Sequence, residues 1–304
     1  MNPEISSTDR IVDRVSRSTV LDPLADALQP AVRRSLDGDG AWAPLKSLLH
    51  GTPLGHPLHP ALTDVPIGAW TMAAVFDGLS FAGISEFDRA SDVAIVTGIA
   101  GAVLAAATGL AEWADTKDEP KRLGMAHASL NTAALMAYAG SLALRAAHRR
   151  RAGIGAAFAG YVIVGLSAYL GGELSYNHQI GVKHTARPIE PSDDFEAVLD
   201  LSQLAGTTPQ RVDYRGIPVL LSRDERHDIS AVAATCTHRG GPLEEGTFAD
   251  GCVKCPWHGG VFSLADGAVR EGPPVYPLAR FEVRVRNERI ELRPRYLSTA
   301  AASG

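Results

Sequence analysis

Cysteine is scarce in this sequence, and its placement argues against a secreted disulfide scaffold. The 304 residues include three cysteines, all of them between Cys236 and Cys255. A disulfide framework would need paired cysteines spread along the chain, whereas close clustering is typical of metal ligation. We therefore expect a metal site in this region.

Several other signals are also missing. The first residues, MNPEISSTDRIVDRVSR, contain neither an apolar core nor a twin-arginine pair, so we expect no cleaved export signal. The net charge of −5 and its distribution do not favour nucleic acid as a partner. The sequence has no nucleophile–base motif, P-loop or dinucleotide fingerprint, which narrows the reaction classes that remain.

What the sequence does contain is a series of four apolar stretches. Each is about 20 residues long and nearly free of charge, as a helix that crosses a bilayer requires. They are rich in Ala and Gly, which lets helices approach one another closely. Four buried helices of a soluble bundle are the alternative, and no internal repeat is evident. The expected spans are 61–84, 92–112, 125–147 and 154–176.

The regions on either side of these stretches differ in character. Residues 1–50 mix apolar and charged positions and predict either an amphipathic helix on the membrane surface or a loosely ordered arm. A polar linker at 184–194 leads to short strand-like runs within 195–296, and 297–304 form a tail. We therefore predict a multidomain chain, with an all-α four-helix transmembrane bundle over 51–183 followed by a small all-β domain.

Six runs in the last domain predict strands. Phe281, Val283 and Val285 alternate with charged residues, which is the period of a half-buried strand, and Asn287 and Glu288 predict the turn that follows. The predicted strands are 218–221, 229–233, 251–254, 275–278, 281–286 and 290–292.

Two short boxes in the β domain carry the candidate chemistry. CTHRGGPL and CPWHGG place Cys236, His238, Cys255 and His258 in a C-x-H and C-x-x-H pattern with sixteen residues between the two parts. Two thiolates and two imidazoles on paired loops suit a two-iron cluster, with the cysteines on one iron and the histidines on the other. Tetrahedral zinc is the alternative, but the close spacing and glycine-rich flanks fit zinc fingers poorly.

These boxes resemble the Rieske family, and the resemblance covers about 194–296. The stretch GPPVYPL (272–278) also resembles the proline-bearing loop that covers the cluster in that family. The resemblance implies a [2Fe-2S] cluster with the four residues above as its ligands. Rieske oxygenases carry a second, mononuclear iron site downstream. No histidine follows His258, so we expect no oxygenase site in this chain, and one-electron chemistry remains.

The departures from the Rieske pattern point to a particular subtype. Quinol-oxidising members carry an extra cysteine in each box, joined as a disulfide, and here Gly241 and Trp257 occupy those positions. Gly260 and Phe262 stand where those members have serine and tyrosine hydroxyls that bond to the cluster. The chain therefore looks like the ferredoxin type that serves oxygenases. Cys252 lies outside the pattern, and we expect it to be a buried, inert thiol.

The apolar half resembles an uncharacterised four-helix bacterial membrane domain family, sometimes fused to a Rieske domain. The resemblance rests on HGTPLGHPLHPALTDVPIGAW, on Asp77 and on GGELSYNHQIGV (171–182). That family implies no established activity.

Several histidines fall at one face of the expected bundle. If four spans hold, His59, His127 and His178 lie nearest its apolar core, with His56 and Glu173 nearby. Ionisable groups at membrane depth are costly and tend to mark function. These residues predict a site for haem b, another metal or a quinone. The alternative is a set of interfacial histidines that cap helices and bind no ligand.

Basic residues near the expected spans favour a cytoplasmic β domain at a bacterial-type inner membrane. Eight of them fall on the side of the β domain and five on the other side, and the positive-inside rule places the more basic side in the cytoplasm. The eight are Arg33, Arg34, Lys46, Lys117, Lys121, Arg122, Lys183 and Arg187, and the five are Arg89, Arg145, Arg149, Arg150 and Arg151.

Together these features predict a membrane-bound electron-transfer protein. Its partners would be the lipid membrane and an electron donor and acceptor, either proteins or a quinone. A redox-sensing or anchoring subunit of a larger oxidoreductase, with no cofactor in its membrane half, is the alternative.

The missing hydroxyls lead to a testable prediction about potential. Fewer hydrogen bonds to the cluster sulfurs stabilise the reduced form less, so the midpoint should lie near the negative end of the Rieske range, about −150 mV. A redox titration of the purified protein measures this value. A strongly positive midpoint would contradict the reasoning.

Overall fold

The computed structural model describes residues 7–36, 43–184, 192–204, 206 and 208–295. It divides into two compact units. The helical unit contains residues 1–39 and 57–181, and the β unit contains residues 40–56 and 182–304. Most of the predicted linker at 184–194, Arg187 and the predicted tail lie outside the described residues.

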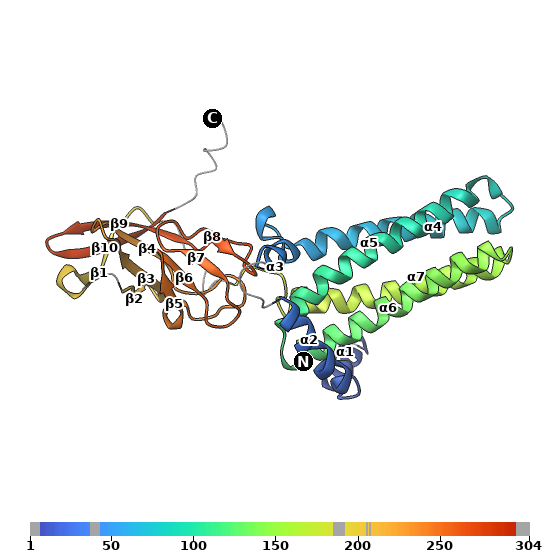
Figure 1. Cartoon of the computed structure of the whole chain (residues 1–304), viewed down its shortest axis with the longest axis horizontal. Helices are drawn as coiled ribbons and strands as arrows, with labels where there is room; N and C mark the ends of the chain where they lie inside the picture. The colour runs from blue at the N-terminus through green and yellow to red at the C-terminus, as the bar shows by residue number, and fades with distance from the viewer. Residues whose placement is uncertain (1–6, 37–42, 185–191, 205, 207, 296–304) are drawn as a thin grey trace, which may run out of the picture. The chain divides into compact units, whose positions relative to one another are not determined.

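Four long helices of the helical unit form two hairpins (Figure 1). In the first, α4 (Leu58–Phe81) passes through the short turn η2 (Ser85–Phe87) into α5 (Asp88–Ala114). In the second, α6 (Asp118–Ala146) is followed by α7 (Arg150–Gly172), which continues into a π-helical turn, η3 (Glu173–Asn177). The four predicted apolar stretches are therefore all helical.

Two segments of the described chain are long and apolar enough to cross a membrane. They are Ser85–Ala114, which contains α5, and Arg150–Asn177, which contains α7. Of the other two long helices, α4 carries Asp64 and Asp77 in its interior, and α6 carries Lys121, Arg122 and Arg145. Crossing by all four helices stays a prediction.

Glycine sets the close approach of the helices within each hairpin. A Cβ atom on Gly98 of α5 would lie 2.2 Å from the Trp70 indole nitrogen of α4. A Cβ atom on Gly160 of α7 would lie 3.1 Å from the Tyr138 ring of α6. Each hairpin thus packs an aromatic ring of one helix directly against the backbone of the next, as the Ala- and Gly-rich composition predicts.

The two hairpins meet through side chains of α4 and α6. The rings of Trp70 and Tyr138 stack with centroids 4.1 Å apart and an interplanar angle of 11°. Near the C-terminal ends of α4 and α6, Arg145 of α6 donates hydrogen bonds to both carboxylate oxygens of Asp77 on α4. The same guanidinium also bonds to Ser91, Asp92 and Ser141. This network satisfies a buried charge from several sides, as a buried ion pair requires.

The predicted N-terminal arm divides between the two units, and its first described part, residues 7–36, is helical and packs within the helical unit. It contains α1 (Ser7–Arg17) and α2 (Asp22–Leu36). Gln29 of α2 donates hydrogen bonds to the carbonyls of Trp113 and Thr116, 3.0 Å each, at the end of α5. Arg122 of α6 pairs with Asp22 at 2.9 Å. These contacts hold α2 against the ends of α5 and α6.

The β unit contains two antiparallel sheets (Figure 1). One has the strand order β1-β10-β9-β4-β3-β2, and the other has the order β5-β6-β7-β8. The strands are β1 (Glu196–Asp200), β2 (Gln210–Tyr214), β3 (Ile217–Arg223), β4 (Ile229–Ala233), β5 (Thr247–Ala249), β6 (Cys252–Lys254), β7 (Val261–Ser263), β8 (Val269–Glu271), β9 (Arg280–Arg286) and β10 (Arg289–Arg295). The unit also contains the short helices α3 (Ala43–His50), η1 (Thr52–Leu54), η4 (Leu201–Gln203) and η5 (Leu243–Glu245).

The predicted strands are largely confirmed, with one exception. Five of the six predicted runs fall on β3, β4, β6, β9 and β10, and Asn287 and Glu288 form the turn with positive φ angles of 50° and 59°. The predicted strand at 275–278 is wrong. Pro274 and Pro277 border and interrupt that run, and proline removes the amide donors a strand needs.

The buried ion pair of the helical unit yields a stability prediction. Asp77→Ala leaves the Arg145 guanidinium without its main partner, and breaking such a pair should cost about 3–5 kcal/mol. Replacing both residues, as Asp77→Leu with Arg145→Met, should cost less, since no unpaired charge stays buried. Thermal unfolding of the full-length protein in detergent compares the two. Equal destabilisation by both variants would contradict the prediction.

Candidate metal centre

Two loops of the β unit present the predicted ligands, and their backbones are built alike. The first loop follows β4, and in it the Cys236 amide donates to the Gly241 carbonyl at 2.9 Å while the Gly240 amide donates to the Cys236 carbonyl. The second loop joins β6 to β7. There the Cys255 amide donates to the Gly260 carbonyl at 2.8 Å, and the Gly259 amide donates to the Cys255 carbonyl.

Both loops need glycine at the same point. Gly240 has φ of 73° and Gly259 has φ of 74°, a left-handed conformation that other residues adopt only with strain. This turn lets the glycine that follows accept the hydrogen bond of the cysteine amide. The similar construction explains why both boxes carry glycine pairs four and five residues after their cysteine.

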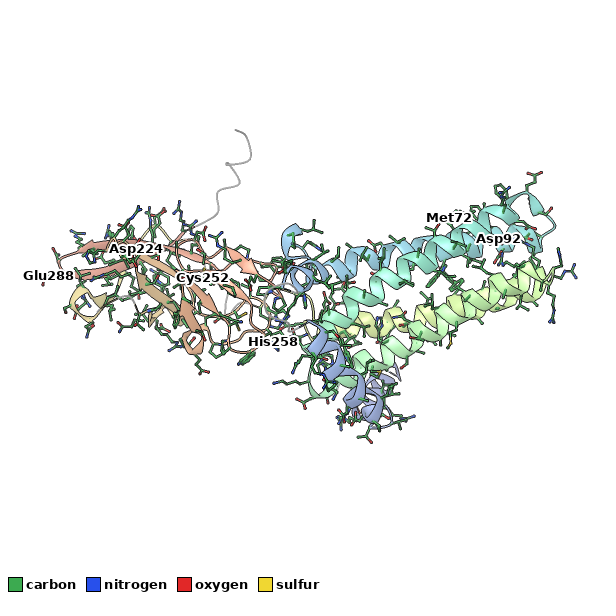
Figure 2. The ribbon with its side chains drawn as sticks, in the orientation of Figure 1. Met72, Asp92, Asp224, Cys252, His258 and Glu288 are labelled. Carbon is green, nitrogen blue, oxygen red and sulfur yellow. The ribbon has the colours of Figure 1, made fainter. Side chains whose placement is uncertain are left out.

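The four predicted ligands converge at the ends of these loops. Cys236 and Cys255 are buried in the core beneath the four-stranded sheet, and their thiols are hydrogen-bonded to each other. The imidazole centroids of His238 and His258 lie 5.1 Å apart, with the rings nearly perpendicular. Figure 2 shows His258 at one end of the β unit and Cys252 within its sheet. Cys252 therefore stays outside the cluster of ligands.

Burial and hydrogen bonding shift the pKa values of Cys236 and His238. The hydrogen bond with Cys255 and burial raise the pKa of the Cys236 thiol, although the backbone amides of His238 and Arg239 act in the opposite direction. Burial lowers the pKa of His238 well below its ordinary value, so its imidazole is neutral at pH 7. Two buried thiolates need a compensating cation. The donor set of two thiols and two imidazoles supplies the ligands of a Rieske-type cluster.

The two positions that differ from quinol-oxidising members face each other. A Cβ atom on Gly241 would lie 3.2 Å from the Trp257 ring and 3.0 Å from the Cys255 sulfur. All three cysteines are free. Where a disulfide would link the loops, this chain therefore has a glycine packed against an indole.

The proline-bearing segment at 272–278 closes over both loops. Thr237 of the first loop donates to the Tyr276 carbonyl at 2.6 Å. A Cβ atom on Gly260 of the second loop would lie 2.4 Å from two ring atoms of Pro274. The segment is an irregular loop in this position rather than the strand predicted for part of it.

A helix from far earlier in the chain packs on the same loops, which sequence reasoning missed. Lys46 of α3 donates to the His258 carbonyl at 3.2 Å, and the Ser47 hydroxyl accepts from the Gly272 amide at 2.9 Å. Thr52 donates to the Pro274 carbonyl at 2.9 Å. The His50 ring lies edge-on to the His238 ring, with centroids 6.1 Å apart. The i, i+4 spacing of the polar residues Lys46 and His50 indicates one face of a helix. It does not indicate that this face contacts the two ligand loops.

The predicted histidines of the helical unit lie on different elements, and His56 belongs to the β unit. His59 of α4 bonds through Nδ1 to the Ala105 carbonyl of α5 at 2.9 Å. His127 of α6 bonds through Nδ1 to the Ser167 carbonyl of α7 at 2.8 Å. His178 follows η3, where its backbone amide donates to the Glu173 carbonyl, and His56 is exposed. Their service as a cofactor site stays a prediction.

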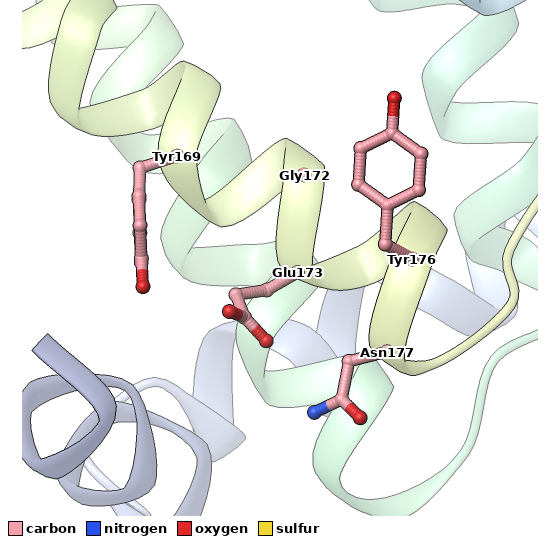
Figure 3. Close-up of a pocket in the computed structure, with 5 residues that line it drawn as sticks. All are labelled: Tyr169, Gly172, Glu173, Tyr176 and Asn177. Carbon is pink, nitrogen blue, oxygen red and sulfur yellow. The ribbon is translucent and has the colours of Figure 1, made fainter. Parts of the chain in front are cut away.

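A pocket of about 580 Å³ lies beside the end of α7. Figure 3 shows the Glu173 carboxylate and the Asn177 amide extending to the same side of the helix. Its described lining consists of Tyr169, Gly172, Glu173, Tyr176 and Asn177. Glu173 is the predicted site residue in this lining. His59 and His127 are not among the described lining residues.

Two families match two successive segments of the chain. Residues 55–184 match a family described as predicted membrane protein (DUF2231), and residues 194–282 match the Rieske [2Fe-2S] domain. Ferredoxin CarAc of Metapseudomonas resinovorans is 33% identical over 89 residues, which cover 29% of this chain and 83% of that protein. The ferredoxin of carbazole 1,9a-dioxygenase from Nocardioides aromaticivorans IC177 is 28% identical, with a TM-score of 0.32 over 34% of this chain and 100% of that one.

A longer relative also matches about a third of the chain. Apoptosis-inducing factor 3 of Mus musculus is 32% identical over 104 residues, which are 34% of this chain. The chain spans only 17% of that protein's length.

The contact of Gly260 with Pro274 predicts the effect of a single methyl group. Gly260→Ala should overpack this contact, at a cost of about 1–3 kcal/mol, and lower the iron and sulfide content of the purified protein. Adding Pro274→Ala removes the two ring atoms and should restore much of both. Thermal unfolding and iron analysis test this pair, and an unimpaired Gly260→Ala variant would contradict it.

The contact of α3 predicts a local change in hydrogen exchange. Ser47→Ala removes the acceptor of the Gly272 amide, worth about 1 kcal/mol, so that amide should exchange faster. Ser222→Ala removes a hydroxyl pair with Ser230 elsewhere in the β unit and serves as the matched control. Equal exchange of the Gly272 amide in both variants would show that the contact is absent in solution.

Proposed function

Because the chain belongs to the Rieske [2Fe-2S] family through its C-terminal domain and carries a predicted membrane protein domain before it, we propose that it is a membrane-bound one-electron carrier. Its cluster would be held by Cys236, His238, Cys255 and His258. The observation that carries the proposal is the convergence of these four side chains on two loops of the same backbone design. A bound cluster would supply reversible one-electron reduction.

The protein's own residues set the conditions for that chemistry. The amides of His238 and Arg239 face the Cys236 sulfur and stabilise its negative charge. Gly260 and the buried Phe262 bring no hydroxyl to the site, which favours a low potential. The 272–278 segment and α3 pack over the loops and limit the access of water. This environment suits a carrier that exchanges electrons and performs no bond chemistry of its own.

The ferredoxin relatives suggest the kind of partner. CarAc and the Nocardioides protein are named as ferredoxins, the latter of a dioxygenase. By this analogy the β unit would exchange single electrons with a redox partner protein, such as an oxygenase component. The helical unit would keep that exchange at the membrane through four crossings, with the β unit in the cytoplasm. A second cofactor at its histidines would give the electron a further destination.

The cluster can be tested directly by spectroscopy. The reduced full-length protein should show the low average g-value typical of mixed Cys and His ligation in electron paramagnetic resonance. Cys236→Ser and His258→Cys should abolish that signal, and Cys252→Ser should leave it intact. Stoichiometric zinc without iron or sulfide, in protein purified anaerobically, would refute the proposal.

The orientation has its own test. A reporter that is active only in the periplasm, fused at residue 304, should be inactive, because the basic residues favour a cytoplasmic β unit. A cytoplasmic reporter at the same position should be active. The opposite pair of results would reverse the proposed topology.

A further inference from the structure

The two hairpins of the helical unit repeat each other, although the sequence shows no evident repeat. In α4, Trp70 lies eleven positions after His59, and Asp77 lies seven positions after Trp70. In α6, the same spacings separate His127 from Tyr138 and Tyr138 from Arg145. Eleven and seven residues are close to three and two helical turns, so each set of three lies along one helix face.

The contacts with the second helix of each hairpin repeat in the same register. Trp70 lies against Gly98 and Tyr138 lies against Gly160. Eleven residues after these glycines, Gly109 lies against the His59 ring, and Gly171 lies against the His127 ring. The hairpins are therefore related by an approximate two-fold axis between α4 and α6.

At two levels along this axis the equivalent side chains meet directly. Trp70 stacks on Tyr138, and Asp77 pairs with Arg145. The third level is formed by His59 and His127, on the same helix faces as those two pairs. His59 and His127 occupy equivalent positions in α4 and α6, eleven positions before Trp70 and Tyr138. The axis thus brings two imidazoles toward each other near one end of the bundle.

The hydrogen bonds of both imidazoles fix the same tautomer. Nδ1 of His59 bonds to the Ala105 carbonyl, and Nδ1 of His127 bonds to the Ser167 carbonyl. A carbonyl only accepts, so each Nδ1 carries the proton and each Nε2 keeps its lone pair. The Asn131 amide nitrogen, 3.0 Å from Nε2 of His127, donates to that lone pair. A histidine that donates through Nδ1 to a carbonyl is oriented to ligate metal through Nε2.

We propose that His59 and His127 together ligate a transition-metal centre in the helical unit, through their Nε2 atoms. Haem iron fits this pair best, because it needs only two axial ligands, whereas a bare zinc or copper ion takes three or four protein ligands. The Asn131 amide would give up its bond to His127 when the metal binds. This centre deepens the proposed electron-transfer function and rests on it for its redox role, while its metal binding does not depend on the Rieske cluster.

The test uses full-length protein purified in detergent from cells supplied with a haem precursor and iron. We expect a haem absorption spectrum with low-spin signals of two axial imidazoles. His59→Gln and His127→Gln should each abolish it, because glutamine still donates to the opposing carbonyl but is a poor iron ligand. His127→Met should shift the spectrum rather than remove it. His178→Gln and His56→Gln are the matched controls and should leave it unchanged.

Further measurements separate the metal sources and the two proposals. Metal analysis that finds a transition-metal ion beyond the cluster irons, without haem and lost in both His→Gln variants, would support the same ligands with a bare ion. Cys236→Ser should remove the Rieske signal and keep the haem signal, so failure of one centre is distinguishable from failure of the other. Folded protein with neither haem nor extra metal, or a signal that survives both His→Gln changes, would overturn the proposal.

Discussion

In each cluster loop a cysteine amide donates to the carbonyl of a glycine five residues later, and the rest of the site depends on this bond. It closes the loop tightly enough to hold the thiol in the hydrophobic core and the following histidine at the edge. The turn requires a left-handed residue just before that glycine, which Gly240 and Gly259 provide. With the loops fixed in this way, two thiols and two imidazoles meet without a disulfide between the loops.

The surroundings of these loops are assembled from distant parts of the chain. The 272–278 segment bonds to the first loop through Thr237 and packs on Gly260 of the second. Helix α3, which precedes the apolar helices, bonds to the backbone of His258 and Gly272. The β unit is therefore completed by α3 and η1, which precede the apolar helices in the chain.

The helical unit depends on a different constraint, the packing of two similar hairpins against each other. Symmetry brings equivalent positions together at the axis, where identical residues are often a poor match. An aspartate opposite an aspartate would repel, so the pair is Asp77 and Arg145. Two different aromatic rings stack above it. At the third level histidine occupies both equivalent positions, His59 and His127. Identical residues suit this level if the two imidazoles bind the same metal.

The sequence by itself determined the two boxes of cysteine and histidine, the four apolar helices and five of the ten strands that the structure describes, because each depends on residue type and short spacing. It could not show the contact of α3 with the cluster loops, since hydrogen bonds to backbone atoms leave no mark on the partner's side chains. Nor could it show the repeat of the hairpins. Complementary pairs such as Asp77 with Arg145 differ in sequence for the very reason that they pair in space. Only the tertiary structure could reveal that repeat.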